Sequence, residues 1–286
     1  MGIVVTGATG HLGRLVIGDL LERGVAPDSL AAVVRSEAKA ADLAARGVEL
    51  RVADYDRPET LKAAFRPGDR VLFVSGSEPG RRIPQHTAVV DAAREAGVGL
   101  LAYTGVLGGP NADFELAREH QATEELILAS KLPYVFLRNG WYSEVYTAQL
   151  PTVLEHGAVV ACAGDGRVAS AARADYAAAA AAVLTEEGHE NSVYELSGDV
   201  AWSFTEYAAL VAELSGRAVE YREVPPEQLL EILVGAGLPK PFAEVLVDVD
   251  RAISRGLLAG TSGTLSRLIG RPTTPIGDSV AAALAG

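Results

Sequence analysis

Short apolar runs alternate with longer amphipathic stretches over the first two-thirds of the chain. This alternation is typical of parallel strands joined by crossover helices. Each apolar run has almost no polar position, as expected for a strand that helices cover on both faces. The predicted strands are 3–6, 30–34, 48–53, 70–75, 100–104, 134–138 and 193–196.

The stretches between these runs have helical periodicity. In the first, Leu12, Val16 and Leu20 fall on one helical face. Gly24 and Gly97 follow predicted helices, where glycine commonly ends a helix. The predicted helices are 11–23, 36–46, 58–66, 81–97, 113–130 and 171–187. We therefore expect an α/β fold with a Rossmann-type, doubly wound parallel sheet.

The pattern loosens after Trp141, where helices are shorter and proline and glycine are more frequent. Helices are predicted over 204–215, 226–234 and 240–255, with a strand at 219–222. We interpret this material as a smaller C-terminal substrate-binding lobe. The expected domains are 1–150 with 171–200 for the nucleotide-binding sheet, and 151–170 with 201–286 for the smaller lobe.

A glycine-rich turn follows the first predicted strand, with the spacing G-x-x-G-x-x-G at Gly7, Gly10 and Gly13. Such glycines permit the tight turn, the approach of a pyrophosphate and close packing of helix on strand. Glycine-rich turns also occur for structural reasons alone, but here the turn opens a full βαβ unit, which favours a dinucleotide site. The expected cofactor contacts here are Gly7, Thr9, Gly10, His11, Leu12 and Gly13.

Arg35 directly follows the second predicted strand, where NAD-binding folds usually carry an acidic residue. A guanidinium at this position favours the 2′-phosphate of NADP(H). The alternative is an arginine that merely covers a solvated strand end. We predict NADP(H) as the cofactor.

With this turn and Arg35 in place, the chain resembles atypical short-chain dehydrogenases/reductases of the NmrA-like group. Further segments resemble the bacterial NAD(P)H:quinone oxidoreductases of type 2, in the same order along nearly the whole chain. One departure is Gly76, where serine is expected in close relatives. The segments that carry this resemblance are 75–80 with Gln85 and His86, 137–144, 163–166, 173–176 and 268–274.

The resemblance implies that NADPH is bound and that its hydride passes to a quinone-like substrate. It further implies that Ser75, Gly76 and Ser77 pass beside the cofactor, and that a second segment lies over the nicotinamide. Both expectations suit an open parallel sheet, which binds ligands at the carboxyl ends of its strands. The second segment consists of Arg138, Asn139, Gly140, Trp141, Tyr142 and Ser143.

No tyrosine is followed four residues later by lysine, the pair with which most short-chain dehydrogenases move a proton. A quinone needs less acid catalysis than a ketone, because the aromatic ring stabilises the hydroquinone anion. His120 and Glu124 are one helical turn apart, so the carboxylate can orient the imidazole. They are also readily explained as an ordinary helix-surface pair. We take His120 and Thr104 as the candidate catalytic residues, although Thr104 is equally explained as the end of a strand.

Trp141, Tyr142 and Tyr146 offer a flat apolar wall for a quinone ring, or else form part of the core. Two other functions stay open. One is a non-enzymatic NADP(H)-binding redox sensor, known among NmrA-like proteins. The other is an isomerase or alcohol-specific reductase, which the missing tyrosine–lysine pair disfavours.

The net charge is −12 without a lysine or arginine cluster, so we expect no nucleic-acid partner. Scattered histidines and a single cysteine, Cys162, indicate neither a zinc site nor an intrachain disulfide. No run reaches the ~18 apolar residues of a membrane span, and no secretory leader is evident. We therefore predict a cytoplasmic protein, and a homodimer stays open.

Overall fold

The computed structural model describes residues 2–78 and 80–285. Seven strands form one sheet in the order β3-β2-β1-β4-β5-β6-β9. Neighbouring strands from β3 to β6 pair in parallel. The bounds are β1 (Ile3–Val5), β2 (Leu30–Val34), β3 (Glu49–Val52), β4 (Arg70–Phe73), β5 (Leu100–Val106), β6 (Tyr134–Asn139) and β9 (Ser192–Leu196). The strand order reverses between β1 and β4, and such a reversal opens a crevice at the carboxyl ends of the strands.

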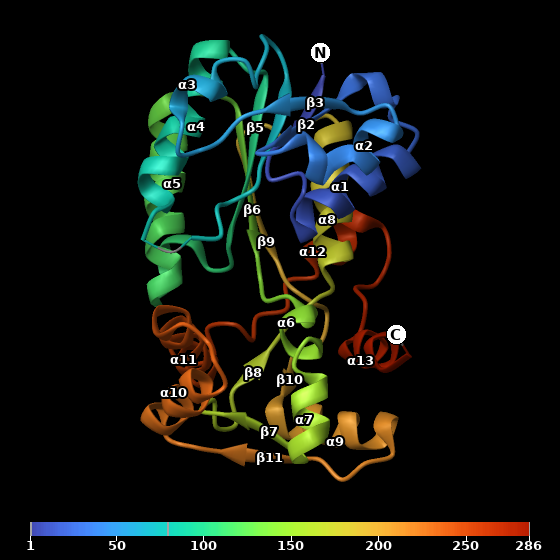
Figure 1. The fold of residues 1–286 in the computed structure, drawn as a ribbon, viewed down its shortest axis with the longest axis vertical. Coiled ribbons are helices and arrows are strands. Elements are labelled where there is room, and N and C mark those ends of the chain that lie inside the picture. The colour runs from blue at the N-terminus through green and yellow to red at the C-terminus, as the bar shows by residue number, and fades with distance from the viewer. Residues whose placement is uncertain (1, 79, 286) are drawn as a thin grey trace. The chain divides into compact units, whose positions relative to one another are not determined.

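Helices cover both faces of this sheet (Figure 1). On one face lie α1 (His11–Glu22), α2 (Ala41–Ala45) and α8 (Arg173–Thr185). On the other lie α3 (Pro58–Leu61), α4 (Arg82–Ala96) and α5 (Glu115–Ser130). Short 3₁₀ turns are η1 (Pro27–Ser29), η2 (Glu37–Ala40) and η3 (Gly109–Asn111). The predicted doubly wound parallel sheet is confirmed.

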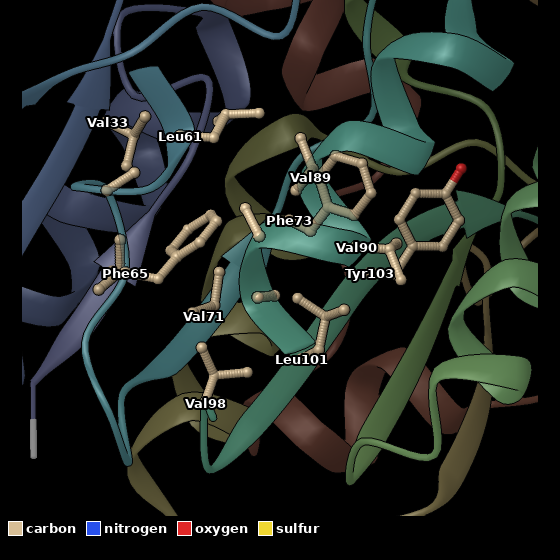
Figure 2. Packing of buried hydrophobic residues seen from close by; sticks show 14 of the residues in the cluster. Val33, Leu61, Phe65, Val71, Phe73, Val89, Val90, Val98, Leu101 and Tyr103 are labelled. Carbon is tan, nitrogen blue, oxygen red and sulfur yellow. The ribbon is translucent and has the colours of Figure 1, made fainter. Parts of the chain in front are cut away.

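The core on one face of the sheet is built from the inward side chains of successive strands and helices (Figure 2). Phe73 on β4 is fully buried and lies at its centre. Its ring meets those of Tyr55, His86 and Tyr103 at centroid distances of 5.8, 4.7 and 5.2 Å. The core therefore extends from apolar strands into a group of polar aromatic side chains beside the carboxyl end of β4.

Two predicted helices differ from those observed. The helix expected over 58–66 ends at Leu61, because the next turn bonds Ala64 N–H to the Leu61 carbonyl and Arg66 N–H to the Asp69 carboxylate. The helix expected over 36–46 divides into η2 and α2. The alanine-rich run in α8 is buried throughout and packs on α1, as a tightly packed helix requires.

The chain divides into two compact units. The first comprises Met1–Pro110, Glu119–Asn139 and Arg173–Glu195, and the second comprises Asn111–Arg118, Gly140–Ala172 and Leu196–Gly286. The second contains α6 (Ser143–Thr147), α7 (Leu150–His156), β7 (Ala158–Ala161), β8 (Arg167–Val168), β10 (Trp202–Ser203), α9 (Phe204–Ser215), β11 (Glu220–Glu223), α10 (Pro226–Gly235), α11 (Lys240–Ser254), α12 (Thr264–Ile269) and α13 (Ile276–Ala285). The assignment of this material to substrate binding stays a prediction.

Local signals explain the parts of the second unit that the sequence pattern predicted. Helix α9 begins with a capping box, in which Ser203 and Glu206 satisfy each other's backbone N–H groups. Pro226 and Gly216 mark a helix start and a helix end. Strand β11 pairs in parallel with β7, and β10 pairs antiparallel with β8. Strand β11 corresponds to the strand predicted at 219–222, whereas β8 and β10 have two residues each and are too short to be recognised by periodicity.

Replacement of Phe73 by alanine is expected to lower the free energy of unfolding by about 3 to 5 kcal/mol, because it leaves a cavity in the centre of the core. Urea unfolding of both proteins measures the difference. Leu128→Ala on α5, where the side chain is 48% exposed, is the matched control and should cost far less. Similar losses in the two variants would contradict the central place of Phe73.

Candidate cofactor site

The turn after β1 has the geometry that the three glycines predicted. Gly7 has a φ of +58°, a left-handed conformation that favours glycine. The Gly10 N–H donates to the Gly7 carbonyl at 2.9 Å. A Cβ at Gly13 would lie 2.5 Å from the Gly7 oxygen, so a larger residue there would force α1 away from the strand. The turn therefore brings the first residues of α1 close to the end of β1.

The N-terminus of α1 is suited to an anion. Gly10 precedes the helix and provides no side-chain cap, and the first turn carries no acidic side chain. Gly7, Gly10 and His11 are exposed, so a ligand can reach their backbone. Free N–H groups and the helix dipole at such an end favour a phosphate. Leu12 is buried, so its side chain belongs to the core and only its backbone is available to a cofactor.

Two cations border this turn. The Arg35 side chain is 74% exposed, and its nearest carboxylate oxygen is on Glu78 at 3.9 Å. Arg14, which the sequence reasoning missed, donates from Nε to the Thr9 carbonyl at 3.3 Å and pairs with Asp42. Its position one helical turn after Gly10 was the available signal. Arg35 is free to turn toward a ligand, whereas Arg14 is tied to the turn itself.

Thr104 lies at the carboxyl end of the sheet and is almost fully buried. Its Oγ1 accepts the backbone N–H of Ser75 at 2.9 Å. The structure thus brings Thr104 to Ser75, the first residue of the predicted cofactor loop. The catalytic role of Thr104 stays a prediction, and its observed contact is with the loop backbone.

His120 and Glu124 are both buried, so the interpretation of them as a helix-surface pair is wrong. The His120 Nδ1 lies 2.7 Å from the Tyr103 hydroxyl. Burial lowers the pKa of His120 well below its usual value, and the nearby Arg82 charge adds to this effect. His120 is therefore a neutral imidazole at neutral pH, and its catalytic role stays a prediction.

Glu124 instead accepts two hydrogen bonds from Arg138, from Nε at 2.9 Å and from Nη2 at 2.7 Å. Arg138 Nη1 donates to Glu195 at 2.8 Å. These carboxylates raise the pKa of Arg138 above its usual value. Its guanidinium also lies where a Cβ at Gly109 would be, 2.1 Å from Cζ. Arg138 thus holds β6, α5 and β9 together, and its side chain is committed to protein contacts.

The predicted nicotinamide segment spans two units. Arg138 and Asn139 belong to the first, and Gly140 to Ser143 belong to the second. Ser143 is buried, and its Oγ lies 3.0 Å from that of Ser170. The cofactor contacts of this segment stay a prediction.

A pocket in the second unit is lined mainly by apolar and aromatic side chains, among them Trp141 and Tyr146. Its volume is about 60 Å³, whereas an engineered cavity that binds benzene measures about 150 Å³. Tyr146 packs edge-on against Trp202 at 4.7 Å, in a cluster that includes Phe204 and Tyr207. This cluster favours the core interpretation of Tyr146 over that of a wall for a quinone ring.

Among the described residues, no group of three or more histidine, cysteine, aspartate or glutamate side chains is arranged to hold a metal ion. None of the helices in this part of the chain is long and apolar enough to cross a membrane.

The buried histidines predict how stability depends on pH. Desolvation lowers the pKa of His86 from 6.5 to about 3 in the folded protein. Between these values the unfolded chain binds a proton that the folded chain does not. The free energy of unfolding should therefore decrease by up to about 1.4 kcal/mol per pH unit as the pH falls through this range.

Urea unfolding at pH values between about 4 and 7 measures this slope in the protein and in His86→Gln, which cannot protonate. The variant should lose stability less steeply on acidification. The variant is needed for comparison because burial also raises the pKa of Asp250 to about 6. Protonation of Asp250 stabilises the folded protein as the pH falls, and so opposes the effect of His86. Equal slopes would contradict the assignment of a neutral, buried His86.

Comparisons with known proteins agree with this geometry. A family model described as NAD(P)H-binding matches residues 7–187. Quinone oxidoreductase 2 of Escherichia coli (strain K12) is 46% identical over 278 residues, which cover 97% of each chain. The expected resemblance to that group of proteins is confirmed.

Two solved structures are also similar over almost the full length. The crystal structure of an NADPH-dependent quinone oxidoreductase from Escherichia coli complexed with NADPH has a TM-score of 0.96 and 46% identity, over 99% of each chain. The Citrobacter sp. triphenylmethane reductase complexed with NADP(H) has a TM-score of 0.94 and 43% identity, over 99% of this chain and all of the other. The chain belongs to the NAD(P)H-binding family.

Proposed function

We propose that this protein is an NADPH-dependent quinone reductase. The observation that carries the proposal is the 46% identity, over 97% of both chains, to an enzyme that is named for quinone reduction. A relative of the same kind has been crystallised with NADPH, and its fold superimposes with a TM-score of 0.96. The glycine turn, the exposed start of α1 and Arg35 supply the local chemistry for that cofactor.

The cofactor would be held by its phosphates. Its pyrophosphate fits the backbone N–H groups of His11 and Leu12 at the start of α1, where the helix dipole favours negative charge. Its 2′-phosphate suits Arg35, whose ion pair with Glu78 is long and largely solvated, and so costs little to exchange. NADPH supplies a hydride to the acceptor when it is bound.

The chain's own polar groups fit an acceptor that needs little acid catalysis. Hydride transfer to a quinone gives a hydroquinone anion, which takes its proton from water. Tyr103 is a poor proton donor, because burial raises the pKa of its hydroxyl above the usual value. Its hydroxyl is also paired with the neutral His120. The task that remains for the protein is to align donor and acceptor.

The test is a panel of benzoquinones and naphthoquinones offered to the purified protein with NADPH or NADH. Oxidation of the nicotinamide is followed by absorbance, with acceptor-free reactions as the control. Quinone-dependent oxidation of NADPH is expected. Tight binding of NADP(H) by calorimetry without turnover on any quinone would instead identify a redox sensor and overturn the proposal.

Arg35→Ala should weaken NADPH binding roughly tenfold to a hundredfold, since a charged hydrogen bond is worth about 1.5 to 3 kcal/mol. NADH binding should change little, because NADH lacks the 2′-phosphate. Calorimetry with both cofactors measures the difference. Arg57→Ala removes another exposed cation and controls for net charge. Equal losses of NADPH and NADH affinity would reject the role of Arg35.

We also infer a cytoplasmic protein with small-molecule partners. Its net charge of −12, without a lysine or arginine cluster, disfavours a nucleic-acid partner. A homodimer is the assembly to test first, by light scattering of the purified protein.

A further inference from the structure

Three successive backbone N–H groups after β4 each donate to a side chain from a different part of the chain. The Val74 N–H donates to Thr6 Oγ1 at 3.0 Å, and the Ser75 N–H donates to Thr104 Oγ1 at 2.9 Å. The Gly76 N–H donates to His86 Nε2 at 3.0 Å. A loop normally leaves such groups to water. Side chains thus fix this loop where it leaves the sheet.

The loop borders the crevice of the nucleotide-binding sheet. Strands β1 and β4 are neighbours, and the strand order reverses between them. A Cβ at Gly7 would lie 3.4 Å from the Cβ of Val74, so the glycine turn and the loop are in contact. Ligands of open parallel sheets bind at this point. The loop that begins at Val74 therefore borders the candidate cofactor site, and Gly76 lies two residues further along it.

His86 supplies the third of these contacts, to Gly76. It projects from α4, is fully buried and packs edge-on against Phe73 at 4.7 Å. Its Nδ1 lies 2.8 Å from Thr123 Oγ1, whose hydroxyl donates to the Glu119 carbonyl at 2.7 Å. Thr123 therefore accepts from Nδ1–H, which assigns the proton to Nδ1 and leaves Nε2 as an acceptor for Gly76.

Arg82 forms a hydrogen bond with the carbonyl of Gly76, the residue whose N–H donates to His86. Its Nε donates to the Gly76 carbonyl at 2.6 Å, and its Nη1 lies 3.5 Å from Glu119. Arg82 is largely buried and, like His86, belongs to α4. His86 thus accepts from the Gly76 N–H, and Arg82 donates to the Gly76 carbonyl. Because both residues lie on α4, this helix fixes the orientation of the peptide groups on either side of Gly76.

We propose that His86 is a positioning residue for the nicotinamide cofactor: through its single hydrogen bond to Gly76 it keeps the loop after β4 in the conformation that receives the ligand. This inference rests on the proposed function only for the identity of the cofactor. A loop that is ordered before binding spares the ligand the entropic cost of ordering it. The loop contacts the glycine turn at Gly7, which is expected to bind the pyrophosphate that NADPH and NADH share. The effect of His86 should therefore be the same for both cofactors.

Three variants test the hydrogen bond itself. His86→Ala removes the acceptor and should weaken the binding of both cofactors roughly tenfold. His86→Gln can accept from Gly76 and donate to Thr123, so it should stay within about threefold of the unchanged protein. His86→Asn is too short to reach Gly76 and should resemble alanine. Thr87→Ala, which alters only a hydrogen bond within α4, is the matched control.

Amide hydrogen exchange gives a second measurement, which a general loss of stability would not reproduce. In His86→Ala the Gly76 amide should exchange much faster, whereas the amides of Val74 and Ser75 should keep their protection. Unchanged exchange at Gly76, or unchanged cofactor binding in His86→Ala, would overturn the proposal. So would a glutamine variant as weak as the asparagine variant.

The glutamine and asparagine variants decide the matter even if alanine prevents folding. Neither binding nor exchange needs a quinone, so these measurements stand whether or not the protein turns over quinones. A failure confined to NADPH would point to the 2′-phosphate contact and would also overturn the role of His86.

Discussion

The candidate site depends on how backbone polar groups are satisfied where β1 and β4 end. The free N–H groups of α1 must stay open for a phosphate, which is why no side chain caps Gly10. The N–H groups of the neighbouring loop are closed instead by Thr6, Thr104 and His86. A buried N–H group without a partner costs free energy. The N–H groups of the loop therefore have side-chain acceptors, and those at the start of α1 are left for a ligand.

Burial of charge beside this loop is compensated in two ways. Arg138 keeps its charge because Glu124 and Glu195 surround it with hydrogen bonds. Among the described residues, no carboxylate pairs with His86 or His120, and both avoid the cost of desolvation by staying neutral. Neutral imidazoles can accept hydrogen bonds, whereas imidazolium ions cannot. The same desolvation that lowers their pKa values therefore makes His86 usable as an acceptor.

The second unit is stabilised by aromatic packing. Its strands are short, and the aromatic cluster around Tyr146 and Trp202 supplies much of its packing. The hydroxyls of Tyr146 and Tyr207 have no hydrogen-bond partner among the described residues. The adjoining pocket is too small for a quinone ring in this conformation. Its aromatic residues are thus understood as structural support, and substrate binding by this unit stays a prediction.

The sequence by itself determined the α/β class, the strands of the main sheet and the cofactor turn. Buried parallel strands and glycine spacings are local patterns, and local patterns are readable without tertiary contacts. The sequence also placed Arg35 at a strand end. It did not reveal that Glu124 pairs with Arg138 rather than His120, since that partner comes from a strand fourteen residues away.

Only the tertiary structure decided what Thr104 and His86 contact. Thr6 directly follows β1, and Thr104 and His86 lie on β5 and α4. They are far apart along the chain and meet only because the sheet places these segments around one loop. No periodicity encodes that meeting. The short strands β8 and β10 were missed for the same reason, because each is defined by its partner rather than by its own two residues.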